Sequence, residues 1–156
     1  RDCLLSRGLG DVYKRQGGMY NFYAMGTADN PRTPVVFVHE FGHSFAGLAD
    51  EYFSSEVAYQ DFYNLKYEPW EPNITTLVNF DAKWKDLLPT NTPIPTPLDD
   101  AHKDKAGVFE GGGYIAKGIY RPMDHCMMRD YAPFCPACSR AILQMIDYFT
   151  DKPIKH

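Results

Sequence analysis

The sequence has 156 residues and a formal net charge of −4, a size that suits one domain with a modest hydrophobic core. Hydrophobic residues make up 44% and charged residues 23% of the chain, which excludes a disordered or collagen-like protein. The acidic balance gives no electrostatic reason to expect DNA or RNA as a partner. No apolar run approaches the roughly 20 residues of a membrane-spanning helix, so we expect no transmembrane segment.

The first sixteen residues, RDCLLSRGLGDVYKRQ, differ in character from the rest of the chain. They begin without Met, and they contain neither the apolar region nor the cleavage site of a signal peptide. The string resembles translated sequencing adapter, and we predict that residues 1–16 are not native. Residues 17–156 are then a portion of a domain that is truncated at its N-terminus, with any signal peptide lost. The alternative is a native N-terminal strand or helix whose leucines enter a core.

The native portion is predicted to open with a strand and a helix. Residues 19–25, MYNFYAM, are typical of an aromatic-rich strand. A helix is expected over 34–46, with Thr33 as its N-cap and Pro34 as its first residue. Apolar residues surround most of this helix, which predicts that it is buried. Gly47 is a natural C-terminal stop.

The remaining elements are shorter, apart from the last helix. Residues 80–88 predict a short helix, and residues 90–100 predict a proline-rich extended loop. Residues 109–122 suit a hairpin around a run of three glycines. A second helix is expected to begin at Cys135-Pro136 and to end at Lys152-Pro153, because apolar residues recur between them at helical spacing.

The most specific motif of the sequence is HEFGH, residues 39–43. On a helix, positions i and i+4 lie on one face, so the imidazoles of His39 and His43 can reach one ion. Glu40 projects from the same turn toward the side of the ion where a water would bind. The pattern therefore predicts a Zn²⁺ site with two histidine ligands and Glu40 as the general base. The alternative is a pair of core histidines with ordinary hydrogen-bond partners.

A catalytic zinc has three protein ligands and one open position, so a third ligand is expected close downstream. Gly47 ends the helix, and Asp50 follows three residues later. This order is similar to the metzincin pattern H-E-x-x-H-x-x-G-x-x-H/D, with one extra residue before the glycine. Asp50 keeps the spacing from the glycine and is the favoured third ligand. Glu51 is the second candidate, because adjacent side chains point different ways, and His102 and His125 are weaker ones.

At this point the sequence resembles a known family. VVFVHEFGHSFAGLADEY, residues 35–52, is similar to the core of the bacterial IgA peptidase family of zinc metallopeptidases. YNFYAMGTADNPR, TPIPTP, FEGGGYIAKGIYRP, CMMR and FCPAC are similar as well, so the resemblance covers essentially residues 17–150. It implies an α+β fold of the metzincin-like zincin type, a single catalytic zinc and peptide-bond hydrolysis. It also implies protein or peptide substrates and secretion or exposure at the cell surface.

The resemblance assigns roles to four residues. His39 and His43 match the first two zinc ligands, Glu40 matches the general base, and Asp50 matches the region of the third ligand. The hypothesis is a zinc-dependent endopeptidase of extracellular proteins, with immunoglobulin A as one candidate substrate. Two alternatives stay open: a secreted binding or structural module that retains zinc, and a zinc amidase of a cell-wall substrate. The oligomeric state is also open.

The family further implies a methionine-containing turn beneath the zinc, followed by the C-terminal helix. Met128 is the favoured residue and Met127 the alternative, and either side chain supplies an apolar, polarizable floor. Tyr131 lies three residues beyond Met128, and related enzymes use a tyrosine near this turn to bind the developing oxyanion. Four other residues compete for that task, namely Tyr52, Tyr114, Tyr120 and Arg121.

Three cysteines, Cys126, Cys135 and Cys138, stand close together near the C-terminus. For a secreted protein, a disulfide from Cys126 to Cys135 or Cys138 is the leading prediction. The first alternative is a structural zinc site made of His125 and the three cysteines. The second is a thioredoxin-type redox pair at the start of the last helix, although the βαβ context of that motif does not precede it.

Overall fold

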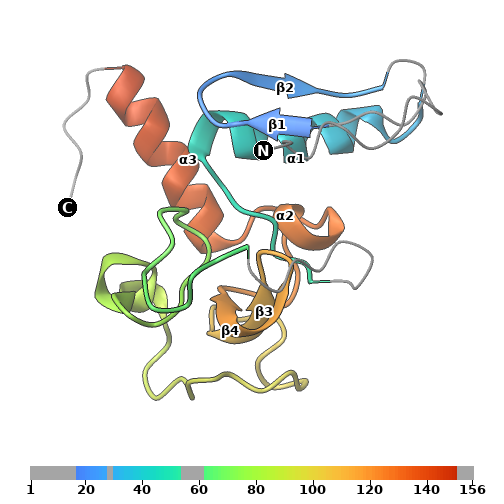
Figure 1. Cartoon of the computed structure of the whole chain (residues 1–156). Helices are drawn as coiled ribbons and strands as arrows, with labels where there is room; N and C mark the ends of the chain where they lie inside the picture. Colours follow the sequence, from blue (N-terminus) through green and yellow to red (C-terminus); the bar gives the residue numbers. More distant parts are fainter. Residues whose placement is uncertain (1–16, 28–29, 54–61, 151–156) are drawn as a thin grey trace. The chain divides into compact units, whose positions relative to one another are not determined.

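The structure is a computed structural model of the whole chain, and it describes residues 17–27, 30–53 and 62–150 (Figure 1). The predicted non-native segment 1–16 lies outside the described residues. The chain divides into two compact units, Arg1–Gly47 and Leu48–His156. Helices and small antiparallel sheets occur together, which agrees with the predicted α+β class.

The first unit contains a two-stranded hairpin where one strand was predicted. β1 (Gly17–Met19) pairs antiparallel with β2 (Tyr23–Met25), and Met19 stands opposite Tyr23. The prediction of a continuous strand over 19–25 is wrong because the chain reverses between the two strands. Asn21 has a φ of 55° at this turn, a left-handed conformation that asparagine adopts more readily than most residues.

The helix α1 (Thr33–Ala46) follows the hairpin and carries the HEFGH motif. It begins one residue earlier than predicted, so its N-cap is Arg32 and not Thr33. The Thr33 hydroxyl instead donates a hydrogen bond to the Thr27 carbonyl. Gly47 ends the helix as predicted, with a φ of 63° and an N–H directed at the carbonyls of Gly42 and His43.

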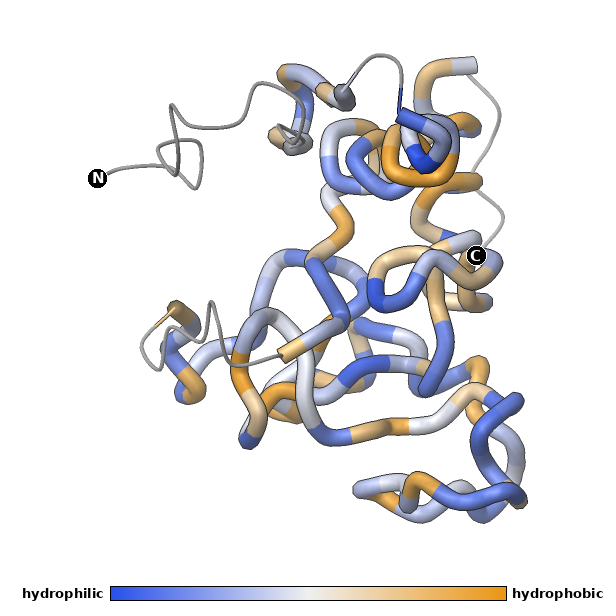
Figure 2. Tube along the Cα trace, turned by 90° about the vertical axis from the view of Figure 1, so that its right-hand side faces the viewer, coloured by the Kyte–Doolittle hydropathy of each residue, from blue (hydrophilic) through white to orange (hydrophobic). Residues whose placement is uncertain are grey.

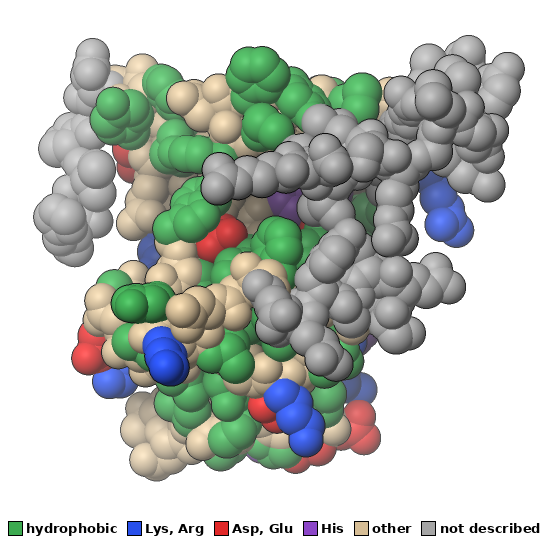
Figure 3. All heavy atoms as spheres, in the orientation of Figure 1, with side chains coloured by type: hydrophobic (Ala, Val, Ile, Leu, Met, Phe, Trp, Pro, Cys, Tyr) green, Lys and Arg blue, Asp and Glu red, His purple; other side chains and the backbone are tan. Residues whose placement is uncertain are grey.

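Burial of α1 is limited to part of its surface, so the prediction of burial on most sides is wrong. Val36 is buried, whereas Phe37, Val38 and Phe41 are 46%, 40% and 44% exposed. In the described part of this unit, β1 and β2 are the elements that pack on the helix, and a two-stranded hairpin covers only one side. The exposed aromatic rings stack along the helix, Phe37 on Phe41 and Phe41 on Phe45. Hydrophobic side chains are accordingly visible on the surface around these elements (Figure 3).

The second unit consists of short elements joined by long irregular segments. The predicted helix over 80–88 forms as two 3₁₀ turns, η3 (Phe80–Ala82) and η4 (Lys85–Leu87). The described stretch 90–100 contains neither helix nor strand, as expected for its proline-rich sequence. Hydrophobic and hydrophilic stretches alternate at short range along this unit (Figure 2).

The predicted hairpin and the predicted start of the last helix are both confirmed, although this helix ends at Phe149 and not at Lys152-Pro153. β3 (Phe109–Gly112) pairs antiparallel with β4 (Ile115–Arg121), and the register shifts near Gly111. Gly111 has a φ of 98°, and a Cβ there would lie 2.5 Å from the Phe53 ring, so glycine is required. The short helix α2 (Met127–Asp130) precedes α3 (Pro136–Phe149), whose N-cap is Cys135.

A small apolar core holds the second unit together. Ala49, Ile74, Ile115 and Ile119 form it, and the Tyr63 ring packs against them. The core therefore joins the residues that follow α1 to the β3–β4 hairpin. No helix among the described residues is both long and apolar enough to cross a membrane.

Candidate metal centre

The helix α1 brings His39, Glu40 and His43 together on one turn. The Nε2 atoms of the two histidines lie 3.2 Å apart. One oxygen of the Glu40 carboxylate and one nitrogen of each ring all lie within 4.8 Å of one another. His39 and Glu40 are each only 4% exposed. The predicted grouping of these three side chains on one helix face is therefore present.

The separation of the two histidine nitrogens suits a shared metal ion. Two nitrogen ligands of a tetrahedral zinc, each about 2.0–2.1 Å from the ion, lie about 3.4 Å apart. The observed 3.2 Å is close to this value, and the ring planes stand at 86° to one another. The same distance permits an N–H···N hydrogen bond between the rings in the metal-free chain. Two imidazoles on one helix face are a donor pair that zinc binds.

Gly18 lets β1 approach the metal-binding turn of α1. A Cβ built on Gly18 would lie 2.2 Å from the Glu40 carbonyl oxygen and 2.9 Å from the His43 Cβ. The hairpin turn is also fixed to the helix, because the Asn21 N–H donates to the Ser44 carbonyl at 2.7 Å. Nothing in the sequence around Gly18 signals a contact with Glu40, which lies 22 positions away.

Gly18→Ala is expected to destabilise the chain by about 1–3 kcal/mol, the usual cost of inserting a methyl group into a tightly packed contact. The added methyl must displace β1 from the backbone of Glu40. Denaturant unfolding measures the change. Gly26→Ala is the matched control, because its Cβ would meet only the Thr33 side chain at 3.6 Å. Equal stability of the two variants would contradict this account of the contact.

Asp50 and Glu51 follow α1, and their carboxylates have different partners. The Tyr114 hydroxyl donates a hydrogen bond to the Asp50 carboxylate. The Glu51 carboxylate accepts from the Asn73 amide at 2.9 Å and from the Cys138 thiol at 3.2 Å. Complete burial raises the pKa of Glu51 well above its usual value. The two adjacent side chains thus point different ways, as the sequence predicted.

Met128 and Met127 also differ in their surroundings. Met128 is fully buried, and its carbonyl accepts the Glu51 N–H at 2.8 Å. Met127 is partly exposed. Of the two, Met128 has the burial that an apolar floor requires, and its backbone joins the methionine turn to the segment that follows α1.

The three cysteines lie together without a disulfide bond. The Sγ atoms of Cys126 and Cys138 are 3.7 Å apart, well beyond the roughly 2.05 Å of an S–S bond. The leading prediction of a disulfide is therefore wrong. Two of the three sulfurs accept hydrogen bonds from the backbone: the Cys135 N–H donates to the Cys126 sulfur and the Cys138 N–H to the Cys135 sulfur, both at 3.4 Å.

Both alternative predictions for the cysteines also need correction. His125 is not part of the cluster, because its ring bonds to the Asp130 carboxylate, and Glu51 takes the fourth position instead. Hydrogen bonds from the thiols of Cys135 and Cys138 lower the pKa of Cys126. The hydrogen bond to Cys126 raises the pKa of Cys135, the residue that a thioredoxin-type motif would activate.

A family model for IgA peptidase M64 matches residues 10–106 and 98–146, which together make up most of the chain. The chain belongs to the IgA peptidase M64 family. It is therefore a peptidase, a hydrolase whose substrates are proteins or peptides. Among curated proteins, none matches the chain significantly.

For a peptidase of this family, the candidates for binding the oxyanion are unequal. The Arg121 guanidinium is fully buried and donates to the carbonyls of Glu110 and Gly111, at 2.7 and 2.8 Å. The Arg121 side chain therefore stabilises the β3–β4 hairpin, and Arg121 is no longer a candidate for binding the oxyanion. Burial, reinforced by the nearby Asp50 carboxylate, raises the pKa of Tyr114 above its usual range, so its hydroxyl stays a donor to Asp50. Tyr131 is 37% exposed at the end of α2 and stays the predicted residue.

Asn73 holds the segment that carries Asp50 and Glu51, a role that the sequence did not reveal. Its side-chain oxygen accepts the Ala49 N–H at 2.7 Å, and its amide donates to the Ala49 carbonyl at 2.8 Å and to Glu51. The side chain is fully buried. The triplet Asn73-Ile74-Thr75 has the form of an N-glycosylation acceptor, but a buried amide is not accessible to such a modification.

Asn73→Ala is expected to destabilise the M64 peptidase by about 2–4 kcal/mol, because it leaves buried backbone groups of Ala49 without hydrogen bonds. The free energy of unfolding, measured in urea, checks the value. The control is Asn64→Ala, which removes one exposed hydrogen bond to the Lys66 N–H. A loss no larger than that of the control would remove Asn73 from this role.

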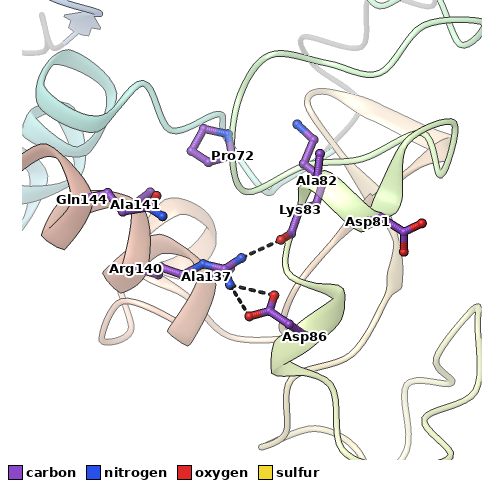
Figure 4. Close-up of a pocket in the computed structure, with 9 residues that line it drawn as sticks. All are labelled: Pro72, Asp81, Ala82, Lys83, Asp86, Ala137, Arg140, Ala141 and Gln144. Carbon is purple, nitrogen blue, oxygen red and sulfur yellow. Dashed lines mark hydrogen bonds and ion pairs between the residues drawn. The ribbon is translucent and has the colours of Figure 1, made fainter. Parts of the chain in front are cut away.

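A pocket of about 380 Å³ lies beside α3 in the second unit (Figure 4). Two of its charged groups bind each other: the Arg140 guanidinium donates to both Asp86 oxygens at 2.7 Å, and it also donates to the Lys83 carbonyl at 2.6 Å. The pocket includes no residue of either metal-ligand group. We therefore assign it no part in peptidase chemistry.

Proposed function

We propose that the chain is a zinc-dependent endopeptidase that hydrolyses peptide bonds of extracellular proteins, with immunoglobulin A as a candidate substrate. The observation that carries this proposal is the grouping of His39, Glu40 and His43 on one turn of α1. The M64 family membership supports peptide bonds as the target. Secretion or exposure at the cell surface belongs to the same proposal and rests on the family resemblance.

His39, His43 and Asp50 are the proposed zinc ligands. The spacing of Asp50 from Gly47 supports its role, as does the engagement of the rival Glu51 with Asn73 and Cys138. In this proposal α1, the turn at Met128 and α3 correspond to the main parts of a metzincin-like zincin domain. The burial of Met128 supports this correspondence.

The proposed mechanism gives the proton transfers to Glu40. When bound, zinc acts as a Lewis acid that makes water acidic near pH 7 and polarises a carbonyl group. Glu40 takes a proton from the attacking water and passes it to the nitrogen of the leaving amine. The Tyr131 hydroxyl, in the proposed role, donates a hydrogen bond to the oxyanion as it forms.

The proposal is tested by proteolysis of an unstructured protein and of fluorogenic peptides by the full chain. Activity is expected to disappear with 1,10-phenanthroline and to return on addition of zinc, and His43→Ala is expected to be inactive. Full activity in protein shown to be free of zinc would overturn the proposal. Bound zinc without proteolysis would favour a binding module, and turnover confined to cell-wall peptides would favour an amidase.

A further inference from the structure

A second group of metal-binding side chains lies outside the histidine site. Glu51, Cys126, Cys135 and Cys138 come from three separate segments of the second unit and meet in its interior. We infer that these four residues bind a structural zinc ion, separate in its ligands from the proposed catalytic one.

The distances within this group, the Cys₃Glu cluster, suit one tetrahedral ion. All four ligand atoms lie within 4.8 Å of one another. With zinc–sulfur bonds of about 2.3 Å and zinc–oxygen bonds of about 2.0 Å, tetrahedral geometry separates two sulfurs by about 3.8 Å and sulfur from oxygen by about 3.5 Å. The observed Cys126–Cys138 sulfur separation is 3.7 Å, and the Cys138 sulfur lies 3.2 Å from a Glu51 oxygen.

Burial of the cluster supplies an independent argument. Glu51, Cys126 and Cys138 have no exposed surface, and Cys135 is 2% exposed. The Glu51 Oε2 atom is buried and accepts no hydrogen bond from any group in the described ranges 17–27, 30–53 and 62–150. A carboxyl group buried among thiols either stays protonated or needs a cation to compensate its charge. A divalent ion bound to the cluster supplies that compensation.

The donor set selects the type of ion. Calcium and magnesium prefer oxygen ligands throughout, whereas three thiolates favour a softer ion such as zinc. An iron–sulfur cluster would need space for inorganic sulfide between its ligands. The four ligand atoms all lie within 4.8 Å of one another, which leaves room for a single ion. Four protein ligands fill a tetrahedral coordination sphere, which is typical of structural zinc and leaves no open position for catalysis.

The position of the cluster in the fold indicates what a bound ion would stabilise. Glu51 lies just after α1, Cys126 just before α2, and Cys135 and Cys138 at the start of α3. The second unit has a small apolar core, and units of this kind often need a metal or a disulfide to hold loops together. A zinc ion here would fix the backbone beside Asp50 and Met128, a consequence that rests on the proposed function.

The test measures zinc in the full chain and in variants that separate the two sites. Wild type is expected to hold about two zinc ions per chain, and His43→Ala and Cys138→Ser about one each. Cys3→Ser, which removes the remaining cysteine of the sequence, is the matched control and is expected to keep both ions. In His43→Ala, X-ray absorption at the zinc edge is expected to show sulfur neighbours at about 2.3 Å.

The decisive variant is His43→Ala, because it does not alter the cluster. Its zinc content can therefore be measured even if Cys138→Ser fails to fold. Zinc missing from His43→Ala, or bound there by nitrogen and oxygen only, would overturn the inference. So would a thiol count below four in unreduced, denatured protein, since it would reveal a disulfide. If wild type holds one ion with sulfur neighbours, the inference stands and the proposed catalytic site fails. If wild type holds one ion and His43→Ala loses it, the inference of a structural zinc is wrong while the proposed catalytic site stands.

Discussion

Glu40→Gln is expected to lower kcat/KM for peptide hydrolysis by about 10²- to 10⁴-fold while the zinc content stays at the wild-type level. The substitution keeps the size of the side chain and removes its ability to take a proton. The histidine nitrogens that face each other at 3.2 Å are untouched, so the metal site should remain intact. Steady-state kinetics on a fluorogenic peptide, together with zinc analysis of the same sample, give both quantities.

Two comparisons make the Glu40→Gln result specific. His43→Ala should lose activity and the ion of the histidine site together, because it removes a ligand. Asp81→Asn changes an exposed carboxylate that pairs with Lys85, and it should leave kcat/KM within a few-fold of wild type. Activity of Glu40→Gln close to that of Asp81→Asn would show that another group is the base. Loss of zinc in Glu40→Gln would make Glu40 a ligand instead.

The features that the sequence predicted correctly depend on local patterns. The HEFGH motif needs only the i, i+4 geometry of a helix, and the stop at Gly47 needs only the left-handed conformation that glycine adopts freely. The hairpin over 109–122 and the helix from Pro136 follow in the same way from a glycine run and from a proline after an N-cap. In each case the residues that decide the structure lie within a few positions of it.

The features that the sequence missed depend on contacts between distant segments. Position 18 must be glycine because the backbone of Glu40 packs against it. Asn73 forms hydrogen bonds to Ala49 and Glu51. In both cases the partners lie more than 20 positions away in the sequence. The spacing of the cysteines predicted either a disulfide or a metal site, and the three side chains do lie together in the fold. It could not indicate that the fourth member would be Glu51, because only the folded second unit brings residue 51 to the start of α3.

Asp50→Asn is expected to remove the ion of the histidine site and to abolish hydrolysis, while the ion of the Cys₃Glu cluster remains. An amide is a much poorer zinc ligand than a carboxylate, and a site left with two histidines binds zinc weakly. Zinc content should fall to about one per chain, with sulfur neighbours in the X-ray absorption spectrum. Tyr114→Phe should have a smaller effect of the same kind, about 10- to 100-fold in zinc affinity, because it removes the hydroxyl that donates to Asp50.

Glu51→Gln is the matched comparison, because the two carboxylates are adjacent in sequence and differ in their partners. It should weaken zinc binding by the Cys₃Glu cluster, whose oxygen ligand it changes, and leave the ion of the histidine site in place. The reverse outcome, in which Glu51→Gln empties the histidine site and Asp50→Asn does not, would exchange the two assignments. The cluster would then lack its fourth ligand. A single pair of variants therefore tests both metal sites, since each carboxylate can serve only the ion toward which its side chain points.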